Sequence, residues 1–174
     1  MINFQQNHFE LFGLQQKFHL DAAELEQSYR GMQSRVHPDK FAHASDAERR
    51  ASMQSSTQVN EAYRTLKSPL ARARYLLGLH QVDLQSENNT AMPPEFLLEQ
   101  MQWRESVEEA AEQPAELSAL ASRLGREMQE LYAELERQLD RESAFGLAAG
   151  TVRKLMFLER LREEISDAME RLEA

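Results

Sequence analysis

The sequence predicts an all-α protein in two parts, a helical hairpin with flanking helices followed by a three-helix bundle. Apolar residues recur three and four positions apart through most of the 174 residues, which is the spacing of amphipathic helices. Only 6 glycines and 5 prolines occur, and the prolines lie between the periodic segments. The two parts also differ in charge. Residues 1–80 carry 10 Lys and Arg and 8 Asp and Glu, whereas residues 81–174 carry 10 Lys and Arg and 21 Asp and Glu.

The first part begins with a short helix and a longer one. One or two helical turns are predicted by the apolar cluster Phe9, Leu11, Phe12 and Leu14. Asp21 is suited to cap the longer helix, with Glu24 three residues on, as in a capping box. The apolar stripe of that helix consists of Leu25, Tyr29, Met32 and Val36. Pro38 should end it, because a residue that precedes proline is driven out of the helical region.

A third helix, antiparallel to the second, and a fourth complete the first part. Asp46 can cap the third helix, and Ser68-Pro69 should end it. Its predicted apolar face consists of Met53, Val59, Ala62, Tyr63 and Leu66. The fourth helix is expected to turn inward Leu70, Ala73, Leu76, Leu77 and Leu79. We therefore predict a first domain over residues 1–84.

Residues 85–94 contain Ser, Asn, Thr and a proline pair and are predicted to be a linker. Residues 95–174 then form three amphipathic helices, the first over 95–111 and the second starting at Pro114, a position where helices tolerate proline. The apolar side of the first helix comprises Phe96, Trp103, Val107, Ala110 and Ala111; that of the second, Leu117, Ala121, Leu124, Met128, Leu131 and Leu135; that of the third, Leu155, Leu158, Leu161, Ile165, Met169 and Leu172. Short connections predict an antiparallel bundle.

The stretch VHPDKF at residues 36–41 separates the two long helices of the first part. As a turn it is ordinary, since proline ends a helix and Asp-Lys suits a turn. In this setting, with a short apolar helix before the hairpin and a fourth helix after it, the arrangement resembles the J domain. The His-Pro-Asp loop of J domains stimulates ATP hydrolysis by heat-shock ATPases of the DnaK type. The resemblance implies that His37, Pro38 and Asp39 form a contact with such an ATPase and no catalytic triad.

The residue types suit a docking loop. Pro38 limits the entropy that the loop loses on docking. Asp39 offers a carboxylate for pairing with an arginine of the partner, and His37 offers a ring nitrogen as donor. Arg35 and Lys40 can add attraction to an acidic ATPase surface, with an ordinary solvated charge as the alternative for each.

A longer match narrows the resemblance to the HscB family, co-chaperones of bacterial iron–sulfur cluster assembly. Its Asn-x-Ala-Tyr-x-Thr-Leu segment and the residues that follow correspond to Asn60, Ala62, Tyr63, Thr65, Leu66, Pro69, Arg72, Ala73, Tyr75, Leu76 and Leu77. HPDKFA at 37–42 and TVRKLMFLERLR at 151–162 fit the same family, so the resemblance spans essentially the whole chain. It implies a heat-shock ATPase of the HscA type and the scaffold protein IscU as partners.

The helix over 95–111 carries a second apolar side. At about 100° per residue, Leu97, Leu98 and Met101 lie roughly 100–200° around the helix from the core position 96. A helix of a three-helix bundle buries one side, so this second side must meet the other domain, a partner or water. HscB proteins hold IscU on such a face, and the matching positions are Leu97, Leu98, Met101, Gln102, Glu105 and Phe157. Glutamine at 102 departs from the acidic residue expected there, and packing against residues 70–84 is the alternative for the three apolar residues.

Several classes of protein are disfavoured. The chain has no cysteine, so disulfides, zinc ribbons and thiolate catalysis are excluded. None of the 5 histidines is paired four residues apart and no Glu-x-x-His occurs, so we expect no metal and no cofactor. The acidic second half argues against nucleic-acid binding. The chain also lacks a phosphate-binding glycine loop and a recognisable nucleophile motif, so we expect no enzymatic activity.

No segment approaches the ~20 apolar residues of a membrane span, and the start of the chain does not resemble a signal peptide. The zinc module with Cys pairs that some family members carry is missing, so the chain resembles the bacterial, cytoplasmic type. Two alternatives remain at this point. The chain could be a J-domain co-chaperone for a different client, or a helical adaptor or enzyme in which His-Pro-Asp is only a turn.

Overall fold

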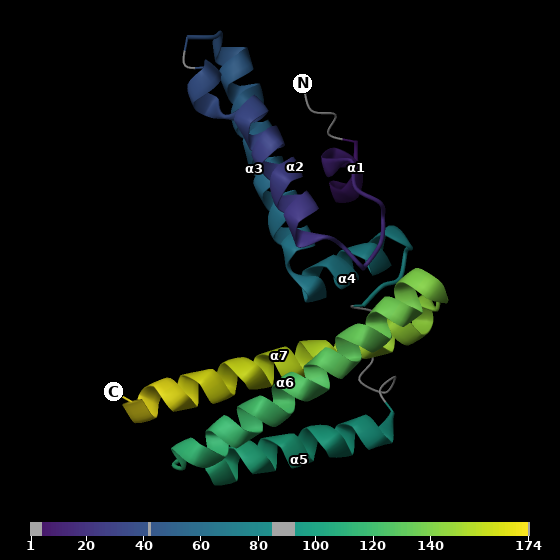
Figure 1. Ribbon diagram of the computed structural model, residues 1–174, viewed down its shortest axis with the longest axis vertical. Coiled ribbons are helices and arrows are strands. Elements are labelled where there is room, and N and C mark those ends of the chain that lie inside the picture. The colour runs from purple at the N-terminus through teal and green to yellow at the C-terminus, as the bar shows by residue number, and fades with distance from the viewer. Residues whose placement is uncertain (1–4, 42, 85–92, 174) are drawn as a thin grey trace. The chain divides into compact units, whose positions relative to one another are not determined.

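Figure 1 shows a computed structural model of the chain, which describes residues 5–41, 43–84 and 93–173. Every regular element in those ranges is a helix, and the all-α prediction is confirmed. The chain forms two compact units, Met1–Leu76 and Leu77–Ala174, and each is considered by itself. The predicted linker lies largely outside the described residues, so the division into 1–84, 85–94 and 95–174 stays a prediction.

The first unit opens with the predicted short helix, α1 (His8–Phe12). Asn7 and Glu10 form a capping box at its start, and Gly13 ends it with φ of 68°, a left-handed conformation that glycine adopts without strain. The backbone N–H of His8 donates to the hydroxyl of Tyr75 at 3.0 Å, and the two rings stack with centroids 4.2 Å apart. This contact holds α1 against α4 (Pro69–Leu79).

The two long helices of the hairpin are α2 (Ala22–Val36) and α3 (Asp46–Lys67). The cap of α2 is Asp21 as predicted, because its side chain accepts the N–H groups of Ala23 and Glu24. The prediction for α3 is wrong by one residue. Its cap is Ser45, whose Oγ accepts the N–H of Glu48 at 3.3 Å while the Glu48 carboxylate accepts the Ser45 N–H at 2.9 Å. A hydroxyl followed three residues later by glutamate completes this reciprocal box.

The interior of the hairpin holds Leu25 and Val36 from α2 and Val59, Ala62 and Leu66 from α3. Met53 is not part of it, since 61% of its surface is exposed, and the prediction was wrong here. Position 59 comes six positions after 53, and at about 100° per position the two lie on different sides of a helix. The buried positions at that level of α3 are serines, Ser52 and Ser55.

A clasp of aromatic and polar side chains joins α2 to α3. The rings of Tyr29 and Tyr63 stack with centroids 4.0 Å apart. The hydroxyl of Tyr29 donates to Asn60 at 3.0 Å, and that of Tyr63 hydrogen-bonds to Glu26. Asn60 and Tyr63 belong to the motif on which the resemblance was based, so part of that motif stabilises the hairpin.

The second unit contains α5 (Pro94–Ala110), α6 (Pro114–Glu136) and α7 (Phe145–Glu173), which lie side by side as an antiparallel bundle (Figure 1). Pro114 begins α6 as predicted. The core consists of Phe96, Trp103, Ala110, Leu117, Leu124, Met128, Leu135, Leu139, Ala148, Ala149, Val152, Leu155, Leu158, Leu161, Ile165 and Ala168. The prediction was wrong for two residues. Ala111 and Leu172 are exposed, because the apolar side of each helix reaches the helix end there.

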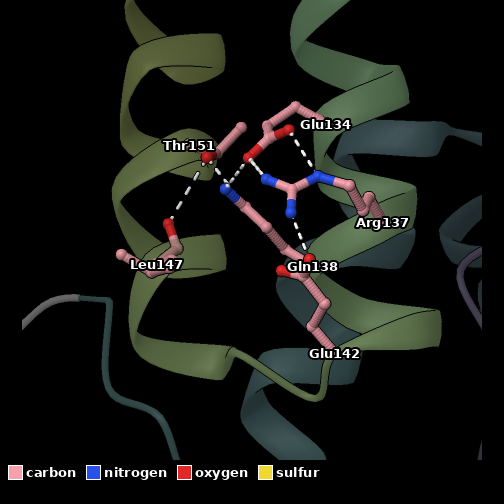
Figure 2. A network of polar contacts seen from close by, with 6 residues as sticks. All are labelled: Glu134, Arg137, Gln138, Glu142, Leu147 and Thr151. Carbon is pink, nitrogen blue, oxygen red and sulfur yellow. Dashed lines mark hydrogen bonds and ion pairs between the residues drawn. The ribbon is translucent and has the colours of Figure 1, made fainter.

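The turn from α6 to α7 is held by a polar network (Figure 2). α6 continues into a π-helical turn, η3 (Arg137–Arg141), and its Gln138 is buried. The Gln138 amide donates to Glu134 at 2.7 Å and accepts the hydroxyl of Thr151 from α7 at 2.9 Å. Arg137 pairs with Glu134 and Glu142, and the hydrogen bond from Arg137 lowers the pKa of the Glu134 carboxyl. The network therefore fixes where α7 begins.

Candidate protein-docking sites

The first candidate site is the loop between α2 and α3. His37 has ψ of 128°, outside the helical region, as expected of a residue before proline. Residues Pro38–Phe41 then form one 3-10 turn, η1, in which the N–H of Lys40 donates to the carbonyl of His37 at 3.0 Å. The Asp39 N–H donates to Nδ1 of the His37 ring at 3.3 Å.

The loop presents charge to solvent. The Asp39 side chain is 89% exposed, and its Oδ2 lies 3.4 Å from Nδ1 of His37. Arg35 and Lys40 are also exposed. The guanidinium of Arg30, one turn earlier on α2, pairs with Glu26 at 2.9 Å. The structure thus groups Arg35, His37, Asp39 and Lys40 at one end of the hairpin.

The second candidate site is a patch on α5, defined by Leu97, Leu98 and Met101. These side chains are 41%, 56% and 68% exposed. Gln102 and Glu105 are exposed beside them, each four residues after an apolar residue of the patch and so on the same side of the helix. Single exposed apolar residues are common, but a cluster of them marks an interaction site.

Phe157, on α7, is only half-buried and meets α5 through Phe96, with ring centroids 5.9 Å apart and planes at 88°. This edge-to-face contact stabilises the pair. Phe157 therefore has a packing role in addition to any role in docking.

A cluster of charged residues that sequence reasoning missed lies on the three helices of the bundle. The Lys154 ammonium of α7 is 3.4 Å from a carboxylate oxygen of Glu99 on α5 and 5.3 Å from the Phe96 ring centroid. The Glu127 carboxyl of α6 hydrogen-bonds to Glu99. Burial, then that hydrogen bond and the charge of Glu99, raise the pKa of Glu127 to about 7, although Arg123 and Lys154 act in the opposite direction.

Within the described ranges, no group of three or more His, Cys, Asp or Glu side chains could hold a metal ion. None of the helices in that part of the chain is long and apolar enough to cross a membrane.

The chain is similar in sequence and in structure to known co-chaperones. Two family models match, the DnaJ domain over residues 7–75 and the HSCB C-terminal oligomerisation domain over residues 92–166. The Co-chaperone protein HscB homolog of Azoarcus sp. (strain BH72) is 51% identical over 174 residues, covering 99% of this chain and 98% of that protein. The solved Chaperone HscB from Vibrio cholerae is 38% identical with a TM-score of 0.85, over 96% of this chain and 99% of that one. The human co-chaperone protein HscB is 28% identical with a TM-score of 0.92, over 99% and 86%.

A His-Pro-Asp loop at the end of a helical hairpin, followed by a helical bundle, defines a J-domain co-chaperone. Such a protein regulates the ATPase of an Hsp70-type partner. The chain belongs to the HscB family, and both resemblances expected from the sequence are confirmed. Its function is accordingly to stimulate a specialised heat-shock ATPase of the HscA type in iron–sulfur cluster assembly.

Proposed function

We propose that the two candidate sites hold two different partners at once. The loop, through His37, Pro38 and Asp39 with Arg35 and Lys40, contacts the ATPase. The α5 patch, with Gln102, Glu105 and Phe157, holds the scaffold protein IscU. Linking the two sites in one chain raises the effective concentration of the scaffold at the ATPase. In this proposal the chain catalyses no reaction itself and is not an enzyme. It works in the cytoplasm, together with the ATPase.

The single observation that carries the ATPase contact is the exposure of the Asp39 carboxylate. At 89% exposure it is available for a charge-assisted hydrogen bond with an arginine of the partner. The rest of the turn is closed by its own backbone hydrogen bonds, so little order has to be gained on docking.

Apolar area supports the client contact. Burying a leucine or methionine completely contributes roughly 1.5–3 kcal/mol, and the three residues of the α5 patch still have about half of that to gain. The α5 patch therefore offers about 3 kcal/mol, enough to matter for a micromolar complex after association costs.

The ATPase contact is tested by Asp39→Asn, with Asp46→Asn as matched control. Both carboxylates are exposed, and both changes remove one charge in the same region. We expect the first to abolish stimulation of HscA-type ATP hydrolysis at unchanged circular dichroism, and the second to leave it within twofold of the parent. Normal stimulation by Asp39→Asn would remove the proposed contact.

The client contact is tested by Leu97→Ala combined with Phe157→Ala, with binding of purified IscU measured by calorimetry. We expect weaker binding while stimulation of the ATPase without scaffold persists. Because Phe157 packs on Phe96, a Leu97→Ala single variant separates lost contact from altered packing. Unchanged affinity would assign these residues to packing within the chain and reopen the question of which client is carried.

A further inference from the structure

The buried side of α3 near the loop contains a hydrogen bond that links it to α2. Ser52 and Ser55 are each only 5% exposed there, where apolar residues would be expected. The Ser52 hydroxyl donates to the backbone carbonyl of Val36 at 2.7 Å, across 16 residues of sequence. Val36 is the last residue of α2 and directly precedes His37.

The carbonyl of Val36 has few other ways to be satisfied. The last four carbonyls of a helix lack partners within it. Pro38 has no N–H to donate, and the N–H of Lys40, four residues after Val36, donates to the carbonyl of His37 instead. The Ser52 hydroxyl therefore supplies the hydrogen bond that the proline-containing turn withholds, at a buried position.

The hairpin is hollowed where α2 and α3 meet the loop. A hollow of about 490 Å³ lies at this end of the hairpin, and its lining includes Met32, Val36, Phe41 and Ser52. The hydrogen bonds made by the Asp39 and Lys40 N–H groups close within the loop, so they set its internal shape and leave its orientation undetermined. The Ser52 bond ties the peptide group that enters the loop to α3.

We propose that Ser52 is a positioning residue for the His37-Pro38-Asp39 loop, orienting Asp39 for productive contact with the ATPase through its hydrogen bond to Val36. The inference rests on the proposed role of Asp39. It adds that a buried residue of α3, which touches no partner, controls the maximal stimulation.

The test measures ATP turnover by an HscA-type ATPase over a titration of the full-length chain carrying Ser52→Ala, Ser52→Cys or Ser52→Thr. Ser55→Ala is the matched control, since Ser55 is equally buried one turn further along α3. All assays run well below the thermal midpoint of each variant, and exchange of the amide hydrogens of residues 37 and 39–41 is followed in parallel.

We expect Ser52→Ala to lower the maximal stimulation roughly three- to tenfold, the range that a single hydrogen bond provides. Cysteine, similar in shape with a weak donor, should lie between alanine and the parent, and threonine should restore at least half of the loss. Amide exchange at residues 37 and 39–41 should rise in Ser52→Ala only, and Ser55→Ala should stimulate within twofold of the parent.

Any of three results would overturn the inference: parental stimulation by Ser52→Ala, parental stimulation by Ser52→Cys, or an equal loss in Ser55→Ala, which would indicate general destabilisation. Asp39→Asn, assayed alongside, separates the two claims. If it abolishes stimulation while Ser52→Ala does not, only the positioning role fails. If Asp39→Asn stimulates normally, the proposed contact itself fails.

Discussion

The loop between α2 and α3 and the apolar patch on α5 are both exposed, but different physics builds them. The loop interrupts two helices and presents a carboxylate whose side chain is 89% exposed. The α5 patch leaves its helix undisturbed and presents apolar side chains that are 41–68% exposed. A contact made by charge depends on orientation, whereas a contact made by apolar area depends mainly on how much surface is covered.

The difference explains why the two sites need different support. In the proposed contact the Asp39 carboxylate has to point correctly, and the stiff turn and the Ser52 hydrogen bond behind it would provide that orientation. The α5 patch needs a straight helix held in the bundle, which Phe96 and the Glu99–Lys154 pair provide.

Among the effects on binding affinity, the largest is expected from removing the α5 patch altogether. Replacing Leu97, Leu98 and Met101 together by alanine should weaken IscU binding by roughly 100-fold, because about 1 kcal/mol of apolar burial is lost at each. Calorimetric titration with IscU measures this. Stimulation of the ATPase without scaffold should remain at the parental level, and a parallel loss of both activities would show that the sites are not independent.

Added salt should weaken the ATPase contact about fivefold and leave the IscU contact nearly unchanged. Exposed charges are screened strongly between 50 and 500 mM salt, whereas burial of apolar area is not weakened. We expect the concentration for half-maximal ATPase stimulation to rise about fivefold over this range, with turnover normalised to the basal rate at each salt concentration. IscU affinity should change less than twofold, and an equal response of both would contradict the contrast.

The stability of the helical bundle that holds α5 should depend on pH. The raised pKa of Glu127 means that, between the ordinary value of 4.5 and about 7, the folded state binds more protons than the unfolded state. The free energy of unfolding therefore falls as pH rises through this window. Because Glu127 is partly exposed, the contribution should be only about 1 kcal/mol. Glu127→Gln should remove it.

Thermal or urea unfolding of the parent and of Glu127→Gln at pH 5 and pH 7.5 measures the difference directly. The variant should gain stability relative to the parent at the higher pH, and other titrating groups cancel in the comparison. A constant difference at both pH values would show that Glu127 does not titrate in this range.

The smallest effect is expected from Pro38→Ala. Alanine can adopt the conformation of the turn but leaves the unbound loop more freedom, which is worth about 0.4–1 kcal/mol. The concentration for half-maximal ATPase stimulation should rise about two- to fivefold. Pro69→Ala, at the exposed start of α4, is the control and should change nothing. Equal effects of both would argue against a stiffened loop.

Most elements of the fold could be predicted from the sequence alone. The described helices, the cap at Asp21, the end of α2 before Pro38 and the second apolar side of α5 all depend on residues at most four positions apart. For residues this close in sequence, the number of positions between them fixes their relative direction around the helix axis. Local sequence is therefore enough to predict these features. The errors at Met53 and Leu172 arose where a stripe drifts around its helix or reaches its end.

Only the tertiary structure decided which contacts between helices lie next to the two sites. The hydrogen bond from Ser52 to Val36 joins residues 16 positions apart, and the pair Glu99–Lys154 joins residues 55 apart. Nothing periodic relates residues on different helices, because their meeting depends on how far each helix is rotated and shifted against its neighbour. The sequence by itself determined where this protein offers a charged loop and an apolar helix face, and the packing of helices decided which side chains of other helices lie against them.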